Sequence, residues 1–260
     1  MKIALFGYGK MGKEIEQIAL HRKHEVILKI DEHNINTVSK DDLKKCDAAI
    51  EFSTPHSAIS NMSRCFDAGV PVVVGTTGWY DKLEDVKKLC KEKNGCLFYA
   101  SNFSIGVNIV FKLNEQLAKI MNTYPDYDVS MEEVHHVHKL DAPSGTAITL
   151  ANGIVNNLQR KTNWKNATQQ EKIKLGETEK YSDSPVPALS DSDFLITSRR
   201  IDEVPGTHTV KYHSAIDDIE IMHKAHNRKG FALGAVLGAE FVKGQKGIFG
   251  MNDLMSFNIN

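Results

Sequence analysis

Long hydrophobic runs, paired cysteine motifs, internal repeats and an excess of either charge are all missing from this sequence of 260 residues. Since no run reaches about eighteen apolar residues, we expect no membrane-spanning segment, and the strand-like residues that follow Lys2 are not typical of a signal peptide. The 32 basic and 33 acidic residues give a formal net charge of −1, which argues against a general nucleic-acid binder. The expected partners are small molecules, with no nucleic acid and no membrane.

Cysteine is scarce and shows no metal-binding pattern. Cys46, Cys65, Cys90 and Cys96 form no C-x-x-C pair, so zinc is disfavoured and no metal is predicted. Unpatterned cysteines are typical of a reducing compartment, and we expect a cytoplasmic protein. The length suffices for one large or two ordinary domains.

A glycine motif between a strand and a helix organises the first thirty residues. An apolar run at residues 2–6 is followed by Gly7-Tyr8-Gly9-Lys10-Met11-Gly12, by helical spacing over residues 14–20, and by a second apolar run that ends at Asp31. The glycines let the backbone approach a pyrophosphate at a helix N-terminus, and the acid can accept hydrogen bonds from a ribose. This whole arrangement, unlike the glycines alone, strongly indicates a dinucleotide site.

Strands and helices alternate up to residue 100. We expect strands at residues 47–52, 70–74 and 96–100, and helices at residues 55–68 and 81–93, which together predict an α/β fold with a Rossmann-like, doubly wound parallel sheet. The ligand should lie beyond the carboxyl ends of the strands, at Gly7 to Gly12, Ser53-Thr54, Gly75 to Thr77 and Ser101-Asn102. Any one of these small polar groups could also be ordinary turn chemistry.

The pattern changes after residue 103. A long helix is expected at residues 105–121, a strand at residues 126–137, and a hairpin from residues 207–213 and 216–225. The polar stretch from Gln159 to Asp193 reads as a long, loosely ordered connection. These features predict a second, α+β domain for substrate and oligomerisation at residues 104–228, with residues 1–103 and about 229–260 forming the dinucleotide-binding domain.

The residues from Glu133 to Ala147 carry the most unusual chemistry. Three histidines, a lysine and two carboxylates fall within nine residues, and a Pro-Ser-Gly-Thr turn then opens a helix capped by Ser144 or Thr146. If the strand persists, Glu133, His135 and Lys139 lie on one face, and His136 and His138 on the other. We interpret the segment as a site that binds a carboxylate or phosphate and protonates it, against the alternatives of a metal site or a solvated edge strand.

The stretch E-x-H-H-x-x-K-x-D-A-P-S-G-T-A closely resembles the signature of the dihydrodipicolinate reductase family, and the resemblance extends nearly from end to end of the chain. It includes Asn102 to Asn108, the Gly206-Thr207-His208-Thr209 turn, and His223-Lys224-Ala225. The resemblance implies reduction of a cyclic imine dicarboxylate with NADH or NADPH on the way to diaminopimelate and lysine. It also suggests a homotetramer.

The resemblance further implies roles for single residues. His135 and Lys139 would carry the acid chemistry, and His136, Lys139, Gly145 and Thr146 would hold the substrate carboxylates. The implied cofactor contacts are Gly7, Tyr8, Gly9, Lys10, Met11, Gly12, Asp31, Gly75, Thr76, Thr77, Ala100, Ser101, Asn102 and Phe103.

Cofactor choice depends on the region after the second strand. Asp31 and Glu32 would repel a 2′-phosphate, and no arginine stands beside them, so we expect NADH to be preferred over NADPH. Against this, Lys40, Lys44 or Lys45 could fold back onto a phosphate. Two other functions stay open on the residues alone: a different Rossmann oxidoreductase, and a catalytically silent dinucleotide sensor.

Overall fold

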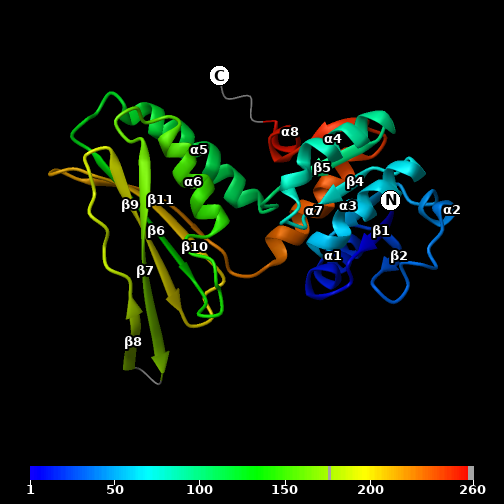
Figure 1. Ribbon diagram of the computed structural model, residues 1–260, viewed down its shortest axis with the longest axis horizontal. Helices are drawn as coiled ribbons and strands as arrows, with labels where there is room; N and C mark the ends of the chain where they lie inside the picture. Colours follow the sequence, from blue (N-terminus) through cyan, green and yellow to red (C-terminus); the bar gives the residue numbers. More distant parts are fainter. Residues whose placement is uncertain (175–176, 257–260) are drawn as a thin grey trace. The chain divides into compact units, whose positions relative to one another are not determined.

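The computed structural model describes the backbone of residues 1–174 and 177–256 and the side chains of residues 1–169 and 184–256. The chain forms two compact units, one of Met1–Ile105 with Arg228–Asn260 and one of Gly106–Asn227 (Figure 1). Each unit has a six-stranded sheet. No helix in the described part of the chain is long and apolar enough to cross a membrane.

The sheet of the first unit is entirely parallel, as the alternation of strands and helices predicts. Its strands lie in the order β12-β5-β4-β3-β1-β2. Their bounds are β1 Lys2–Phe6, β2 Glu25–Ile30, β3 Ala48–Glu51, β4 Val72–Val74, β5 Cys96–Tyr99 and β12 Gly247–Phe249. The central strands are buried on both sides, which explains why they read as unbroken apolar runs.

Helices cover both faces of this sheet and enclose two hydrophobic clusters. One face carries α1 (Lys10–His21), α7 (Lys229–Val242) and α8 (Met251–Met255), and the other carries α3 (Pro55–Ala68) and α4 (Leu83–Glu92), with the short α2 (Lys40–Leu43) beside α3. A 3-10 turn, Tyr80–Lys82, precedes α4. Near the C-terminal end of this unit, β12 extends the sheet beyond β5.

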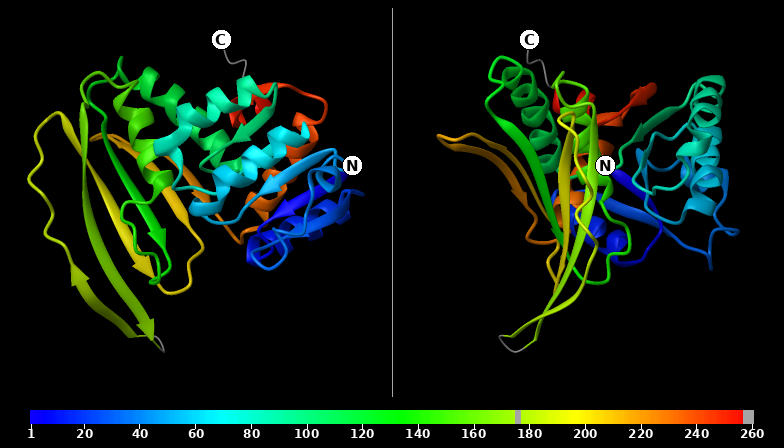
Figure 2. Two further views of the ribbon diagram at one scale, coloured as in Figure 1. Left: turned by 45° about the vertical axis from the view of Figure 1, so that its right-hand side comes forward. Right: turned by 60° about the vertical axis from the view of Figure 1, so that its left-hand side comes forward.

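The sheet of the second unit is mixed, in the order β11-β10-β6-β9-β7-β8. Its strands are β6 Asp128–His135, β7 Asn163–Lys174, β8 Glu177–Asp183, β9 Asp193–Ile201, β10 Thr207–His213 and β11 Asp218–Lys224. Strand β9 is parallel to both β6 and β7, and the other pairs are antiparallel. Helices α5 (Ile105–Met121) and α6 (Gly145–Val155) pack together on one face (Figure 2).

Side chains of this sheet alternate between the helix-covered face and the other one. In β6, Val129 and Met131 enter the core against α5 and α6, and Glu133 and His135 follow at the same period of two. The pleat therefore brings a carboxylate and an imidazole into the buried face, directly beyond the apolar core.

The prediction of a loosely ordered connection from Gln159 to Asp193 is wrong, because β7 and β8 occupy most of it. Pairing with other strands makes this segment part of the sheet. Residues 163–171 of β7 pair with β9, and β7 also forms an antiparallel pair with β8 at the sheet edge. The segment is polar, so it lacks the apolar alternation by which a strand is recognised from sequence. Residues 175–176 of this expected connection lie outside the described residues.

Candidate active site

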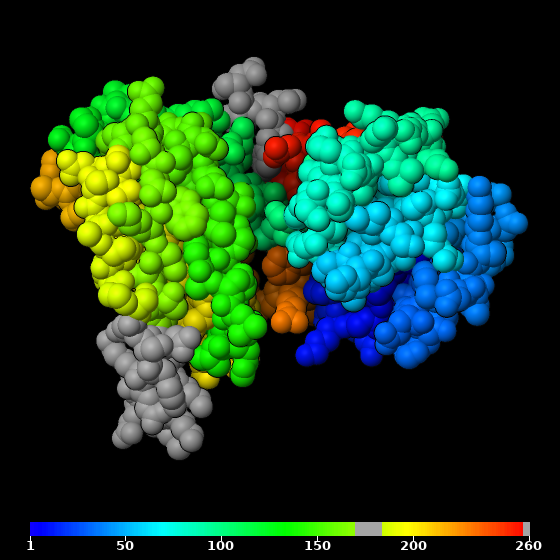
Figure 3. Space-filling view, in the orientation of Figure 1, coloured from blue at the N-terminus to red at the C-terminus, as the bar shows by residue number. Residues whose placement is uncertain are grey.

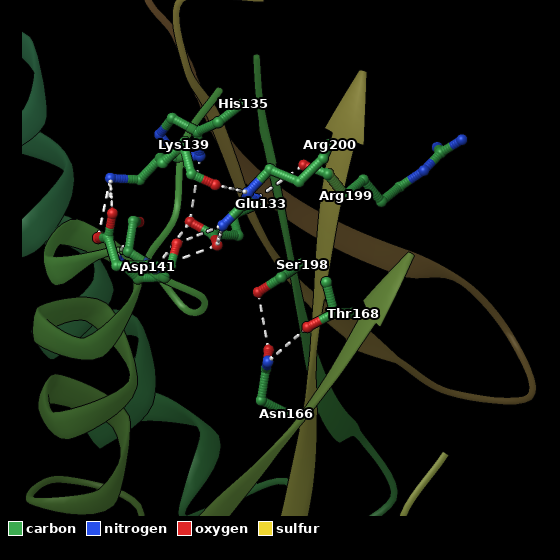
Figure 4. A network of polar contacts seen from close by, with 11 residues as sticks. Glu133, His135, Lys139, Asp141, Asn166, Thr168, Ser198, Arg199 and Arg200 are labelled. Carbon is green, nitrogen blue, oxygen red and sulfur yellow. Dashed lines mark hydrogen bonds and ion pairs between the residues drawn. The ribbon is translucent and has the colours of Figure 1, made fainter. Parts of the chain in front are cut away.

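The residues that follow His135 do not continue the strand. β6 ends at His135, and the chain turns: the amide of Lys139 donates to the carbonyl of His136 at 3.1 Å, and that of Val137 donates to Asp202 at 3.0 Å. The expectation that Lys139 shares a strand face with Glu133 and His135 is therefore wrong. The turn, not the pleat, brings Lys139 back toward them, as the sticks in Figure 4 show.

Glu133 is the centre of the polar network, with a fully buried side chain. Both carboxylate oxygens accept from the backbone amide of Ser144 at 3.1 Å, and Oε1 also accepts from Arg200 at 3.1 Å. Burial raises the pKa of Glu133, but polar contacts with the side chains of His135, Ser144 and Ser198 together outweigh burial and hold this pKa well below its usual range. Glu133 is thus an ionised acceptor, and no proton donor.

Arg200 lies opposite His135 in the register of β9 and β6, and its side chain is only 1% exposed. Besides Glu133, its guanidinium donates to the carbonyl oxygens of Asp141 at 2.6 Å and Lys139 at 3.3 Å. Figure 4 shows the neighbouring Arg199 pointing away from the network. One buried cation therefore ties the turn after β6 to the sheet.

His135 is the buried imidazole of the site. Its Nδ1 lies 3.2 Å from Oε2 of Glu133, close enough for an ion pair but without the alignment of a hydrogen bond. Its ring meets that of His208 edge-on, with centroids 5.1 Å apart. Gly206, at φ +150°, leaves room for the other ring nitrogen, because a Cβ there would lie 3.1 Å from Nε2. These contacts fix the ring while leaving it able to exchange a proton.

The Lys139 ammonium donates to both oxygens of Asp141, at 2.7 and 2.9 Å. Burial raises the pKa of Asp141, but the hydrogen bond and the charge of Lys139, together with the charge of Arg200, outweigh burial, so the net pKa falls. The next histidine, His136, is half-buried, and its ring centroid lies 6.1 Å from that of the exposed His138. A cation and two imidazoles thus stand around the end of β6.

Helix α6 begins where the motif predicts. Ser144 is the N-cap, its Oγ accepts from the amide of Ala147 at 3.2 Å, and Gly145 and Thr146 form the first turn. Backbone N–H groups at a helix start attract anions, and a Cβ on Gly145 would meet nothing within 4 Å, so space exists beside it. The choice left open between Ser144 and Thr146 as cap is settled in favour of Ser144.

Two further histidines stand in line with Glu133 across the sheet. His208 of β10 pairs in register with Glu133 on one side and with His223 of β11 on the other. Burial lowers the pKa of His208 to about 3, with a smaller contribution from the charge of His135. Burial likewise lowers the pKa of His223. His208 is therefore a neutral neighbour of His135.

Sequence reasoning assigned no role to Arg200 or His208. A signal existed for Arg200, because Phe194, Ile196, Ser198 and Arg200 follow the buried alternation of β9. A buried arginine requires an acceptor, and Glu133 was the unpaired carboxylate of the motif. His208 entered the sequence analysis only as one residue of the Gly206 to Thr209 turn, which is part of the resemblance to the family.

Glu133, His135 and His208 each bring one possible metal-ligand atom within 4.8 Å of the others. The Glu133 carboxylate, however, already faces the Arg200 guanidinium and the Ser144 amide. A divalent cation would compete with that fixed positive charge. This fixed charge disfavours a metal ion at the group.

The first unit contains a cavity of about 600 Å³ along the carboxyl ends of β1, β2 and β3. Four residues expected at the cofactor line it, namely Gly7, Tyr8, Gly9 and Asp31. A second cavity, of about 310 Å³, is lined by Met11, Gly75, Ser101 and Phe103 of the expected set and by Phe52, Arg228 and Phe231. The remaining expected residues, Lys10, Gly12, Thr76, Thr77, Ala100 and Asn102, are absent from both linings.

The glycines test whether this cavity suits a pyrophosphate. Gly7 has φ +89°, and a Cβ there would lie 2.1 Å from the carbonyl oxygen of Phe52. A Cβ on Gly12 would lie 2.2 Å from the carbonyl oxygen of Gly7, so α1 packs tightly against the first turn. At Gly9, the N-cap of α1, a Cβ would meet nothing within 4 Å. Two glycines are needed by the fold, and the third leaves open space at the helix start, as a dinucleotide requires.

A buried carboxyl beneath the cavity escaped sequence reasoning. Glu51, the last residue of β3, accepts from the hydroxyl of Ser53 and from Asn61 at 3.3 Å, and both of these residues line the larger cavity. Burial raises the pKa of Glu51 more than these donors lower it. The carboxyl thereby supports the turn after β3.

Two of the three lysines considered for a 2′-phosphate form ion pairs with neighbouring acids. Glu32 is exposed, and Lys44 and Lys45 form ion pairs of 2.8 Å with Asp41 and Asp42. This segment, in mid-blue, forms part of the surface of the first unit in Figure 3. Asp31 itself accepts from the amide of His33 at 2.9 Å, which orients the carboxylate at the cavity.

The chain is similar to known proteins over nearly its whole length. Residues 1–103 match the family model for the N-terminus of dihydrodipicolinate reductase, and residues 106–255 match the model for its C-terminus. It is 44% identical over 260 residues to the 4-hydroxy-tetrahydrodipicolinate reductase of Christiangramia forsetii, covering 98% of each chain.

Solved structures show the same fold at lower identity. A dipicolinate-bound dihydrodipicolinate reductase from Paenisporosarcina sp. TG-14 is 22% identical, with a TM-score of 0.72 and coverage of 97% of this chain and 98% of that one. An amine dehydrogenase from Mycobacterium smegmatis is 12% identical, with a TM-score of 0.58 and coverage of 95% and 94%.

Proposed function

This chain belongs to the dihydrodipicolinate reductase family, and on that premise we propose that it reduces 4-hydroxy-tetrahydrodipicolinate to tetrahydrodipicolinate with a reduced pyridine nucleotide, in the synthesis of diaminopimelate and lysine. The observation that carries the proposal is the cluster at the end of β6. There a buried imidazole, a lysine and a helix N-terminus gather around one turn. A cyclic dicarboxylate that must accept a proton needs this set of groups.

Within this reaction the side chains of the second unit bind charge and supply a proton. Nicotinamide, when bound, would supply the hydride, and the balance of the reaction requires the 4-hydroxyl group of the substrate to leave as water. His135 donates the proton, with Lys139 contributing positive charge and a second donor. His136, Lys139 and the amides of Gly145 and Thr146 hold the two carboxylates.

The nucleotide belongs to the first unit in this proposal. Residues 1–103 with about 229–260 bind the dinucleotide, and residues 104–228 bind substrate and form the oligomer. Gly7 to Gly12 approach the pyrophosphate, Asp31 accepts from the ribose, and Gly75 to Thr77 with Ala100 to Phe103 complete the cofactor contacts. Support comes from the cavity along Gly7, Gly9 and Asp31 and from the open space at Gly9.

We further propose that NADH is preferred to NADPH. Asp31 and Glu32 oppose a 2′-phosphate by like charge. Two of the lysines that could have neutralised it are engaged elsewhere, Lys44 with Asp41 and Lys45 with Asp42. Steady-state kcat/KM for the two nucleotides tests this choice, and a higher value for NADPH would contradict it.

Compartment and assembly complete the proposal. Cys46, Cys65, Cys90 and Cys96 are buried free thiols, which suits the reducing cytoplasm. A homotetramer would form through the second unit, where α5 and α6 pack on the same sheet face and no helix among the described residues of that unit covers the opposite face.

The assay couples enzymatic synthesis of the unstable cyclic substrate to loss of nicotinamide absorbance. The proposed reductase consumes NADH only when the substrate-forming enzyme and its precursors are present. A different Rossmann oxidoreductase would consume NADH with another carbonyl or imine, and a silent sensor would bind NADH and consume none. Absence of substrate-dependent NADH loss, with NADH binding intact, would refute the proposed reaction.

A further inference from the structure

We propose that Arg200 and Glu133 are positioning residues, which hold the proton donor His135 and the turn from Lys139 to Asp141 in place, and that Arg200 does not bind the substrate. This inference rests on the proposed function, which gives His135 its role. A cationic side chain beside a site for a dicarboxylate would ordinarily be expected to bind the substrate. The contacts of Arg200 instead indicate a positioning role.

The donors of Arg200 are already in use. Its guanidinium makes four hydrogen bonds: to Oε1 of Glu133 at 3.1 Å, and to the carbonyl oxygens of Lys139 at 3.3 Å, Asp141 at 2.6 Å and Arg199 at 2.8 Å. Too few N–H groups are left for the bidentate grip by which arginine binds a carboxylate. The side chain is also 1% exposed, so a substrate has no access to it.

Glu133 connects Arg200 to the groups proposed to act on the substrate. Its carboxylate receives Arg200 from β9, the amide of Ser144 at the start of α6, and Nδ1 of His135 at 3.2 Å. One buried anion therefore joins the proton donor, the helix that begins the anion site, and the cation that clamps the turn. Shifting any one of them would move the proton donor relative to the carboxylate-binding groups.

The neighbouring pair on the same two strands supplies a matched control. Glu132 and Arg199 form an ion pair of 3.6 Å on the other face of the sheet, with side chains 44% and 29% exposed. Glu132 and Arg199 are the same residue types as Glu133 and Arg200, and each precedes its counterpart by one position in the chain. Exposed pairs of this kind contribute little to stability, so their replacement should leave the reaction unchanged.

The first test compares Arg200→Lys with Arg199→Lys. Lysine keeps the charge but has no planar fork to hold two carbonyl oxygens and a carboxylate together. We expect Arg200→Lys to lower kcat by about 10²-fold, as small misplacements of catalytic groups do, and to raise KM by no more than Lys139→Ala does, because Arg200 acts on the substrate carboxylates only through the turn that carries Lys139. A rise in KM larger than that of Lys139→Ala, with normal kcat, would show that Arg200 binds substrate itself and overturn the inference.

The second test measures kcat and KM in Glu133→Gln, with Glu132→Gln as control. The neutral amide offers one acceptor oxygen in place of two to the amide of Ser144, Arg200 and His135, so kcat should fall by about 10²-fold. Glu133→Asp keeps the charge and both acceptor oxygens and should recover part of kcat, while Glu132→Gln should keep the wild-type kcat. A lower melting temperature in Glu133→Gln with wild-type kcat would show a purely structural role and overturn the inference.

A buried pair can unfold the protein when one partner is removed, so the double variant Glu133→Gln/Arg200→Met removes both charges together. If it folds, binds NADH and keeps wild-type kcat, the inference is wrong. A measurement on the unaltered protein needs no variant and no substrate: nitrogen NMR should find the proton of neutral His135 on Nδ1, facing Glu133. The opposite tautomer would also refute the inference, whereas an inactive wild type with the Nδ1 tautomer would refute only the proposed reaction.

Discussion

His135 and Lys139 lie in the same turn but differ in what they offer a substrate, since one is a buried imidazole and the other an ammonium held by Asp141. His135→Ala and Lys139→Ala should each lower kcat by about 10²–10⁴-fold, the usual loss of acid–base assistance. Lys139→Ala should also raise KM, because a carboxylate loses its charged partner. Initial rates over a range of substrate concentrations separate the two effects.

His136→Ala serves as the comparison and should act mainly on KM, since His136 is proposed to hold a carboxylate and not to deliver the proton. Melting temperature and NADH affinity should stay at wild-type values in all three variants. A near-normal kcat in the His135 and Lys139 variants would contradict the catalytic roles proposed for these two residues.

A second residue-scale prediction concerns His208, whose pKa burial lowers to about 3. The unfolded chain takes up this proton near pH 6.5 and the folded chain does not, so stability is complete above pH 6.5 and falls as the pH drops toward 3. The cost is about 1.4 kcal/mol per pH unit in that window. Between pH 7 and pH 5, urea unfolding of the wild type should lose about 2 kcal/mol that His208→Gln does not lose.

Trp164 of β7 reports unfolding of the same unit, and the exposed His33 of the first unit supplies the control variant His33→Gln. This control should keep the full acid sensitivity of the wild type. Equal losses of stability in the wild type and in His208→Gln would mean that His208 is protonated in the folded protein.

At the scale of elements, the sequence predicted those helices whose ends are marked by residues within the helix or next to it. Pro55 at the start of α3 and Gly69 in the left-handed conformation after it mark both ends of that helix, and the predicted range of residues 55–68 is confirmed. Strands β7 and β8 have no such signal, because β7 pairs with β9 farther along the chain and β8 then pairs with β7. The role of Arg200 was hidden for the same reason, since three of its four acceptors are 59 to 67 positions away in the chain.

The first βα turn allows a prediction that separates folding from binding. Gly7→Ala should destabilise the protein strongly, because the new Cβ would lie 2.1 Å from the Phe52 carbonyl at a φ of +89°. Gly9→Ala should keep the wild-type melting temperature, since nothing lies within 4 Å, yet weaken NADH binding about tenfold or more by filling the space for the pyrophosphate. Calorimetric titration with NADH and thermal unfolding test both. Tight NADH binding by Gly9→Ala would place the pyrophosphate elsewhere.

At the scale of the whole molecule, the chain leaves the first unit after Ile105 and returns to it at Arg228. The return supplies α7, which packs on the parallel sheet, and β12, which extends it. The second unit is thus an insertion whose sheet has β11 at one edge and one face without its own helix. A second copy of the chain could pair with such an edge strand or pack against such an uncovered face.

The last prediction is that the protein is a homotetramer assembled through this sheet, with a mass by light scattering four times the 29.0 kDa of the chain. Met222 of β11 is 61% exposed in the single chain and points to the helix-free face, opposite to the partly buried Ile221. Met222→Lys should place a charge in each contact and shift the mass to dimers or monomers at micromolar concentration. Leu20→Lys changes an equally exposed apolar residue, 55% exposed on α1 of the first unit, and should leave the tetramer intact. A monomer mass for the wild type, or a tetramer that withstands Met222→Lys, would exclude this sheet as the interface.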